Sequence, residues 1–450
     1  MRADFLTALS LSRAYASGQL DPVTVVTRSL DSAAHEPGAF ITMTPERALE
    51  EATQAAERWK RGTPLSPLDG VPLAWKDLFD VAATVTTAGS AVHAMHAAAR
   101  VDAPLVASAA RAGMICVGKT NLSEFAYSGL GLNPHFGTPA NRALDGGSRA
   151  PGGSSSGAAI AVAAGVVPLA IGTDTGGSVR VPAAFNGVVG YRASTARYPK
   201  GGLTALSPTL DTSGPLAHTV ADCAAFDAAV RATSWPTTPT GATLKGERFV
   251  VDPAFSERHP VSAPVLANLR AVVERLRDAG AQVDTRQFET LLQFHELMGR
   301  HGWLGGLEAF DLHRAMLDSP DAALIDQRVR TRLEASRAIP VERRAFLREQ
   351  RLGLIAMFRA ELAGATLIAP TVPHVAPPRA PLEADPELFA RINLNTLSMT
   401  MPGSFLDTPA VAMPSGTDAD GLPTGVQLMR AQNDDDALLR IAMSVEQFAF

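Results

Sequence analysis

Cysteine is nearly absent from this sequence. Its 450 residues include two cysteines, Cys116 and Cys223, and each lies in an apolar stretch. Buried free thiols are therefore expected rather than a disulfide, and this is typical of a reducing compartment. The N-terminal stretch, which Arg13 interrupts, holds no apolar run as long as a secretory leader needs. Together these absences predict a cytoplasmic location.

Long hydrophobic runs and clusters of positive charge are missing as well. A membrane helix needs about 18 or more nearly uninterrupted apolar residues, and no segment reaches that length. The 45 Asp and Glu exceed the 40 Lys and Arg, which gives a net charge of −5, and no run of Lys or Arg stands out. Neither a membrane nor a nucleic acid is therefore expected as a partner.

Histidine is present but is not grouped as a metal site requires. His93 and His96 lie three residues apart, with no further candidate ligand near them in the sequence. A protein zinc site takes three or four ligands. We therefore expect no metal ion, and no cofactor is indicated either.

The sequence does have a large apolar content, and no domain boundary is visible in it. Hydrophobic residues make up 46% of it, enough for a substantial core. No long polar or low-complexity stretch marks a boundary, and the longest piece rich in Pro, Thr and Gly spans only 235–243. Although the length alone would allow about three domains, we expect one domain over residues 1–450.

Strand and helix patterns alternate along the first third of the chain. Residues 39–43 predict a strand and 45–59 an amphipathic helix. The apolar octapeptide 70–77 predicts a buried strand that ends at Lys76, although a strand-end lysine commonly reaches solvent. The stretch 119–126 has Thr and Asn followed by Glu, a pattern that caps a helix. This alternation predicts an α/β sandwich.

The stretch 151–182 is distinguished by its small residues. Residues 158–164 are all Ala, Val or Ile, which predicts a tightly packed helix, and 166–171 predict a buried strand. The Ser/Gly turn before the helix could be a flexible linker or an anion-binding loop, but the apolar residues after it argue against a linker. The turn at 173–178 is either a plain left-handed turn or one whose N–H groups converge as in an oxyanion hole.

Five segments of the sequence form one recognisable pattern: GVPLAWKD (70–77), KTNLSEFA (119–126), PGGSSSG (151–157), GTDTGGSVRVPAAFNG (172–187) and LDTSGP (210–215). With them the sequence resembles the amidase signature family of hydrolases. The resemblance is dense from about residue 66 to 215 and weaker over the rest of the chain. It implies one large α/β/α sandwich, with a mixed central β-sheet covered by helices.

The resemblance also implies the reaction and its residues. It makes Ser178 the nucleophile, Ser154 a proton-relaying serine that follows a cis peptide bond, and Lys76 the general base. A serine hydroxyl becomes nucleophilic only when a base takes its proton, and a lysine can act as that base only if burial lowers its pKa. The implied enzyme is an amidase that hydrolyses an amide C–N bond through an acyl-serine, releasing ammonia or an amine and a carboxylic acid.

Further roles come with the same resemblance. Backbone N–H groups of Thr175, Gly176 and Gly177 are expected to form the oxyanion hole. A second group is expected to support the loop by hydrogen bonds: Ser155, Asp174 and Arg180. For Arg180, contact with the substrate is the alternative.

The substrate is less well defined by the sequence. Residues 290–400 and the loop 127–135 are expected to line the acyl pocket, with Tyr127 and Gly129 as candidate substrate contacts. A stand-alone hydrolase of a small amide, with a homodimer allowed, is the favoured function. The alternative is an A-type subunit of the glutamine-dependent tRNA amidotransferase, which needs partner subunits. Ala193 stands where a proline is frequent in the family, and this departure favours the first function.

Overall fold

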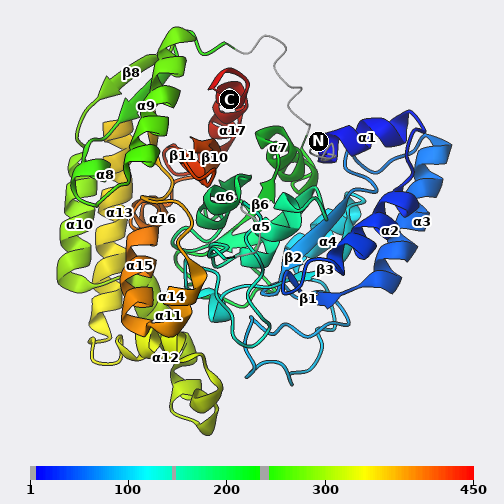
Figure 1. The fold of residues 1–450 in the computed structure, drawn as a ribbon, viewed down its shortest axis with the longest axis horizontal. Helices are drawn as coiled ribbons and strands as arrows, with labels where there is room; N and C mark the ends of the chain where they lie inside the picture. The colour runs from blue at the N-terminus through cyan, green and yellow to red at the C-terminus, as the bar shows by residue number, and fades with distance from the viewer. Residues whose placement is uncertain (1–6, 144–147, 234–242, 450) are drawn as a thin grey trace.

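An 11-stranded sheet crosses the molecule and carries helices on both of its faces (Figure 1). The computed structural model describes residues 7–143, 148–233 and 243–449. The piece at 235–243 that is rich in Pro, Thr and Gly therefore lies almost wholly outside the described residues. Because parallel and antiparallel pairs both occur in the sheet, the predicted sandwich with a mixed sheet is confirmed.

The strand order places the first half of the chain on one side of the sheet and the last part on the other. β2 pairs in parallel with β3 and β4, β7 pairs in parallel with β8 and β9, and the remaining pairs are antiparallel. Across the sheet the strands are β1 (Phe40–Met43), β3 (Ile115–Thr120), β2 (Pro72–Lys76), β4 (Leu169–Asp174), β6 (Thr212–Ala217), β5 (Val189–Arg192), β10 (Ala410–Thr417), β11 (Pro423–Met429), β9 (Thr366–Pro370), β7 (Arg248–Val251) and β8 (Gln282–Thr285).

The helices fall into a group that covers the sheet and a group that stands beside it. The first group comprises α1 (Ala8–Ala16), α2 (Pro22–Ala33), α3 (Pro45–Arg61), α4 (Pro104–Arg111), α5 (Ser156–Ala163), α6 (Arg180–Asn186), α7 (Val220–Val230), α9 (Ala263–Asp278) and α17 (Asp435–Ala449). The remaining helices are η1 (Glu124–Ala126), α8 (Ala254–Glu257), α10 (Glu289–His301), α11 (Leu304–Leu317), η2 (Pro320–Leu324), α12 (Gln327–Glu334), α13 (Glu342–Leu362), α14 (Arg379–Ala384), α15 (Pro386–Leu397) and α16 (Met401–Phe405).

Successive side chains of the central strands point to opposite faces of the sheet and therefore pack against different helices. In β2, Leu73 and Trp75 pack into the core cluster that α1, α4, α7, α9 and α17 complete, whereas Ala74 joins the cluster beneath α2, α3, α5 and α6. Small residues on this second face let α5 approach closely, because a Cβ on Gly157 would collide with the carbonyl oxygen of Ala39. The serine-containing turn before α5 is thereby held against the end of the sheet.

Two of the predicted elements differ from the structure. The helix expected at 119–126 is wrong: Lys119 and Thr120 belong to β3, and only the short η1 follows, with Phe125 at a φ of 51°. The pattern failed because the Asn121 side chain donates to the carbonyls of Gly38 and Gly137 instead of capping a helix. The strand expected at 166–171 begins at Leu169 and continues to Asp174, which carries it into the second turn.

The helix α6 is among those that were not predicted, and the cysteine prediction is confirmed. The α6 segment contains Pro182, which argues against a helix interior but is tolerated in the first turn, where it lies. Cys116 and Cys223 are both buried free thiols.

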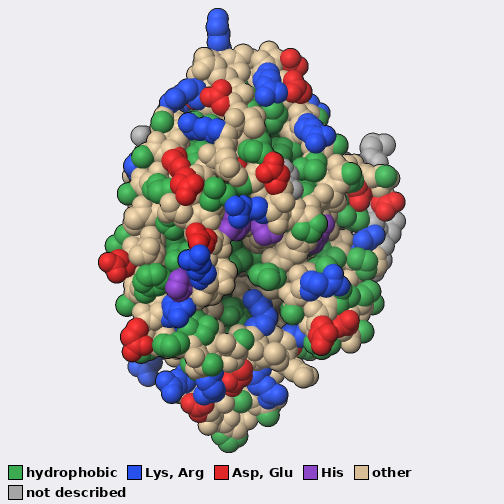
Figure 2. All heavy atoms as spheres, turned by 90° about the vertical axis from the view of Figure 1, so that its left-hand side faces the viewer, with side chains coloured by type: hydrophobic (Ala, Val, Ile, Leu, Met, Phe, Trp, Pro, Cys, Tyr) green, Lys and Arg blue, Asp and Glu red, His purple; other side chains and the backbone are tan. Residues whose placement is uncertain are grey.

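The helices beside the sheet form the left-hand side of Figure 1, where α10, α13 and α15 stand roughly alongside one another. Figure 2 turns this side toward the viewer. Acidic and basic side chains are interspersed over it, and the surface is hollowed near its middle. The face therefore carries no large field of one sign.

Candidate active site

Lys76 ends a strand in which every residue is buried. Its side chain is fully buried rather than reaching solvent. The ammonium nitrogen Nζ donates to Ser154 Oγ at 2.7 Å and to Thr173 Oγ1 at 2.8 Å. Burial lowers the pKa of Lys76 to about 7, and the opposing charges of Asp211 and Asp174 restore only part of the loss. A lysine in this position can exchange a proton near neutral pH.

Ser154 lies in the tight turn before α5, and the peptide bond between Gly153 and Ser154 is cis, as the family resemblance implies. The Ser154 carbonyl accepts hydrogen bonds from the N–H groups of Ser123, at 3.1 Å, and Ser156, at 2.9 Å. The turn is also crowded, since a Cβ on Gly153 would lie 2.6 Å from the nitrogen of Gly131. These contacts fix the position from which the Ser154 hydroxyl reaches Lys76.

Ser178 lies in the second Gly-rich turn, between β4 and α6, and lines a cavity. Its carbonyl accepts a hydrogen bond from the Ser155 N–H at 3.2 Å, so the two serine-containing turns are joined through their main chains. The Ser155 hydroxyl donates to the Thr173 carbonyl at 3.3 Å. The structure thus brings the predicted residues Lys76, Ser154 and Ser178 to one end of β2 and β4.

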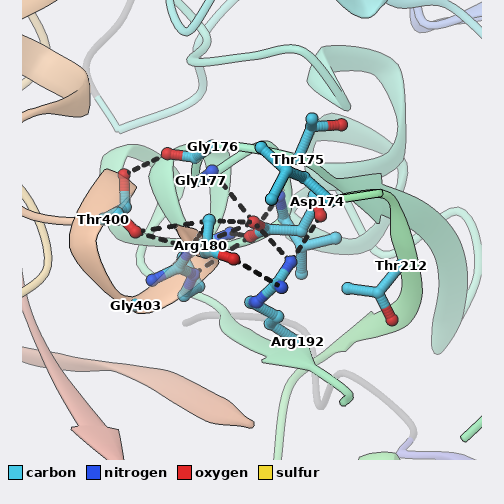
Figure 3. A network of polar contacts seen from close by, with 12 residues as sticks. Asp174, Thr175, Gly176, Gly177, Arg180, Arg192, Thr212, Thr400 and Gly403 are labelled. Carbon is cyan, nitrogen blue, oxygen red and sulfur yellow. Dashed lines mark hydrogen bonds and ion pairs between the residues drawn. The ribbon is translucent and has the colours of Figure 1, made fainter. Parts of the chain in front are cut away.

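A cluster of buried charged side chains supports the Gly-rich turn that carries Ser178 (Figure 3). The Asp174 carboxylate accepts from Arg180 Nε and Nη2, each at 3.0 Å, and lies 3.4 Å from Arg192 Nη1. Burial alone would raise the pKa of Asp174, but the charges of Arg180 and Arg192 outweigh it and hold this pKa well below its ordinary value. Asp174 is therefore ionised, and its negative charge is balanced by two guanidinium groups.

The predicted role of Gly177 as an oxyanion-hole donor differs from what the structure shows. Asp174 Oδ1 accepts the Gly177 N–H at 2.9 Å, so this group is already bonded and is not a free oxyanion donor (Figure 3). Within the part of the chain that the structure describes, the N–H groups of Thr175, Gly176 and Ser178 have no protein acceptor. Gly177 has a φ of 135° and a Cβ there would collide with Thr400, so glycine is required for the shape of the turn.

Arg180 is fully buried and makes all of its described contacts with protein groups. Besides Asp174 it donates to the Thr400 carbonyl, Ser404 Oγ and Gln427 Oε1, at 3.1, 2.8 and 2.8 Å. It does not line the cavity at Ser178. This geometry supports the structural role and gives no support to substrate contact.

Three residues around the two turns received no role from the sequence, although they lie within or a few residues beyond the family segments. Thr173 is the second partner of the Lys76 ammonium. Asp211 accepts from Thr175 Oγ1 at 2.5 Å, and burial raises its pKa. Arg192 contacts Asp174 from β5. The only signal in the sequence was their place inside or beside the quoted segments, because each acts through a long-range contact.

The cavity at Ser178 is small, with a volume of about 130 Å³. One side is formed by the serine- and glycine-containing turns, and the other by Trp303 and by helices α12, α15 and α16, so the prediction that residues 290–400 contribute is in line with its lining. It is lined by Ala126, Tyr127, Ser128, Thr175, Gly176, Ser178, Leu206, Trp303, Arg332, Asn393, Leu394, Leu397 and Met401.

The two candidate substrate contacts are placed differently. Tyr127 lines the cavity, whereas Gly129 does not. Instead, the Gly129 N–H donates to Asn393 Oδ1 at 2.8 Å, and its carbonyl accepts the Gly153 N–H at 2.8 Å. Gly129 therefore links the wall of the cavity to the turn that carries Ser154.

Metal binding and membrane insertion each require a distinctive arrangement of side chains. Within residues 7–143, 148–233 and 243–449, no group of three or more His, Cys, Asp or Glu is placed to hold a metal ion. His93 and His96 stack on each other, with ring centroids 4.4 Å apart. Among the described residues, no helix is both long and apolar enough to cross a membrane.

Comparison with known proteins decides the family. The sequence pattern that describes the family Amidase matches residues 23–439. This chain belongs to the amidase signature family. It is therefore a hydrolase of amide C–N bonds. A solved structure described as an amidase has a TM-score of 0.86 at 30% identity, covering 99% of this chain and 100% of its own.

Two relatives of this amidase differ in the activity for which they are named. One is a 2-amino-5-chloromuconic acid deaminase of Comamonas testosteroni, 35% identical over 91% of this chain and 88% of the relative. The other is the A subunit of a glutamyl-tRNA(Gln) amidotransferase from Cupriavidus taiwanensis, 32% identical over 91% of this chain and 89% of the relative. Similarity at this level therefore shows the family and does not decide the substrate.

Proposed function

We propose that Ser178 attacks the carbonyl carbon of a small amide while Ser154 takes the Ser178 proton and passes its own proton to Lys76. The observation that carries this proposal is the 2.7 Å contact between Lys76 Nζ and Ser154 Oγ at a fully buried site. With its pKa lowered to about 7, a large share of Lys76 is neutral near pH 7 and has a lone pair for that proton.

The attack forms the bond between Ser178 Oγ and the carbonyl carbon and moves the π electron pair to the carbonyl oxygen. The unpaired N–H groups of Thr175, Gly176 and Ser178 are the donors we propose for this oxyanion, and each such donor is worth about 3–4 kcal/mol. The C–N bond then breaks, and the leaving nitrogen takes the proton back from Lys76 through Ser154. Water attacks the acyl-Ser178 ester by the same relay and releases the carboxylic acid.

The small cavity supports a substrate with a short acyl group. We further propose that residues 1–450 act as one domain, in the cytoplasm and without nucleic acid. Size-exclusion chromatography tests whether the working form is a homodimer.

Ammonia release from a panel of aliphatic, aromatic and urea-like amides tests the proposal. The wild-type protein is expected to release ammonia, and Ser178→Ala to lose at least a thousandfold of the rate. Ser156→Ala is the matched control, because Ser156 is a buried neighbour of Ser154 to which we assign no step. Formation of hydroxamate when hydroxylamine is added would report the acyl-enzyme. Equal release by wild type and Ser178→Ala would overturn the assignment.

The similarity to amidotransferase A subunits favours one other candidate, a subunit that passes ammonia to a partner. That function requires glutamine as the ammonia donor and B and C subunits for transfer. Glutaminase activity that rises when those subunits are added would support it. Hydrolysis of other amides by the chain alone, with no response to the subunits, would support the stand-alone hydrolase.

A further inference from the structure

A positive charge without a carboxylate partner lies in the cavity of Ser178. Arg332, on α12, lines this cavity, and none of the described residues lining it is Asp or Glu. Burial lowers the pKa of Arg332, and only the Tyr127 ring opposes that loss. By contrast, the enclosed Arg180 and Arg192 both face Asp174. Because a guanidinium keeps its charge at neutral pH, Arg332 is a cation that the described protein groups do not neutralise.

The guanidinium of Arg332 is held in one orientation. Its central carbon lies 4.3 Å from the centroid of the Tyr127 ring, and Nη1 donates to the Tyr127 carbonyl. Stacking fixes the plane of the group, and the carbonyl uses one of its donors. The other N–H groups have no acceptor among the described residues, and they are available to a molecule in the cavity.

Asn393, on α15, adds a neutral donor to the same wall. Its Oδ1 accepts the Gly129 N–H at 2.8 Å and the Ser128 hydroxyl at 3.1 Å. A main-chain N–H can only donate, so this contact settles which amide atom is the oxygen. The Nδ2 group therefore lies on the other side of the carboxamide, and it has no acceptor among the described residues.

A wall with a fixed guanidinium, an adjacent amide N–H and no acidic group suits an anion, and a planar guanidinium matches a carboxylate best. The remaining lining is largely apolar, including Leu206, Trp303 and Leu397. We propose that Arg332 and Asn393 bind a carboxylate on the acyl part of the substrate, so that this amidase prefers short amides that also carry a carboxylate. This inference rests on the proposed role of Ser178.

The volume of the cavity limits the length of such a substrate. About 130 Å³ accommodates an acyl chain of a few heavy atoms between Ser178 and the wall. Monoamides of short dicarboxylic acids have this composition: an amide at one end, one to three methylenes and a carboxylate at the other. Binding the far end by a charged hydrogen bond would place the amide at Ser178 in a fixed position.

The alternative is that Arg332 only holds α12 against the loop at Tyr127. Loss of that role would lower activity on charged and neutral amides alike. Loss of carboxylate binding would instead lower the ratio of the activity on the charged amide to that on the neutral amide, mainly by raising KM for the charged amide. The ratio therefore separates the two roles.

The experiment compares kcat/KM for matched pairs: malonamic acid with propanamide, succinamic acid with butanamide, and glutaramic acid with pentanamide. For wild type, at least one charged member is expected to exceed its neutral partner tenfold or more. In Arg332→Gln that ratio should fall at least tenfold, mainly through a higher KM, and Arg332→Lys should recover part of it. A wild-type ratio near one, or an unchanged ratio in Arg332→Gln, would overturn the inference.

Arg330→Gln is the matched control. Arg330 lies on the same helix, donates to the Ala322 carbonyl at 3.1 Å and does not line the cavity. Its variant should keep the wild-type ratio. A melting temperature for each variant shows whether it is folded.

Failure of the inference and failure of the proposed function are distinguishable. Hydrolysis that depends on Ser178 but shows no preference for charged amides would contradict the inference and would still support the proposed function. If no pair is hydrolysed, calorimetric binding of succinate and butyrate still decides the inference. Tighter succinate binding by wild type than by Arg332→Gln would support it, and equal binding would overturn it.

Discussion

The two sides of the cavity are built in different ways. The side with Lys76, Ser154 and Ser178 consists of strand ends and two turns, locked by main-chain contacts such as Ser155 N–H to Ser178 O. The opposite side consists of single side chains from separate helices, among them Trp303 and Arg332. The first side leaves little freedom to change a residue without moving the chemistry. The second can change its side chains while the backbone stays in place, so selectivity is adjustable there.

The largest effect that would test this contrast is expected for Lys76→Met. Removal of the proposed base should lower kcat by about a hundredfold to ten-thousandfold, with little change in the melting temperature, because a buried lysine is replaced by an apolar side chain of similar length. Steady-state kinetics and thermal unfolding measure the two effects. Near-normal kcat would contradict the proposed base.

Lys119→Met is the matched control, because Lys119 lies next to the end of the neighbouring strand β3, opposite Trp75, and is also fully buried. Its ammonium, however, lies 2.5 Å from Asp77 Oδ1. Removal of one partner of a buried ion pair costs about 3–5 kcal/mol. This variant should therefore lose stability, which Lys76→Met should not.

The next largest effect concerns the support of the turn. Asp174→Asn should lower the free energy of unfolding by about 3 kcal/mol or more, because Arg180 loses its buried counter-charge and Arg192 keeps only its pair with Asp407. Denaturant unfolding measures the loss. Asp436→Asn is the control: this exposed carboxylate pairs with Arg197 at 2.5 Å, and exposed pairs contribute about 0–1 kcal/mol. Equal losses in both variants would show that the buried cluster is not what holds the turn.

The pH dependence of the reaction tests the proton relay more finely. With the pKa of Lys76 lowered to about 7, kcat/KM on a neutral amide should rise about tenfold per pH unit below that pKa and level off above it. The same shift affects stability. Because the unfolded lysine keeps its proton up to its ordinary pKa near 10.5, the stability of wild type relative to Lys76→Met should rise with pH from about 7 to 10. A flat rate profile between pH 5 and 9 would contradict the relay.

The smallest effect is expected on the helical side. Trp303→Phe should widen the cavity slightly, raising KM for propanamide two- to fivefold and lowering it for phenylacetamide. Since kcat for the smaller amide depends on the opposite wall, it should stay within about twofold. Steady-state kinetics with propanamide and phenylacetamide measure these changes. A large fall in kcat with both amides would show that the helical side affects the chemical step as well as binding.

The sequence predicted individual residues on the side of Lys76, Ser154 and Ser178, but on the helical side of the cavity it predicted only a region. Lys76, Ser154 and Ser178 lie in short segments whose spacing carries the information. Gly177 was misassigned because its N–H is taken by Asp174, a side-chain contact that no spacing reveals. The helix expected at 119–126 failed for a related reason, since Asn121 bonds to distant carbonyls. Local patterns predict what neighbours in the chain do, and these features depend on tertiary contacts.

Arg332 and Asn393 were not predicted for the same reason. Arg332 is one of many arginines in the helical region, and nothing in the sequence distinguishes it from Arg330. Its role depends on the Tyr127 ring beneath it and on a carboxylate that is missing nearby. A missing partner is visible only in three dimensions.

Because β5 pairs with β10, an early part of the chain depends on a part that is synthesised much later. The ribosome makes Lys76, Ser154 and Ser178 long before Thr400, Ser404 and Gln427, which are the acceptors that Arg180 needs. Until residues 400–427 emerge, the turn that carries Ser178 lacks its support and the β5 edge lacks its neighbour. A chain that has not yet reached Gln427 is therefore expected to be inert, so that hydrolysis requires residues made long after Ser178.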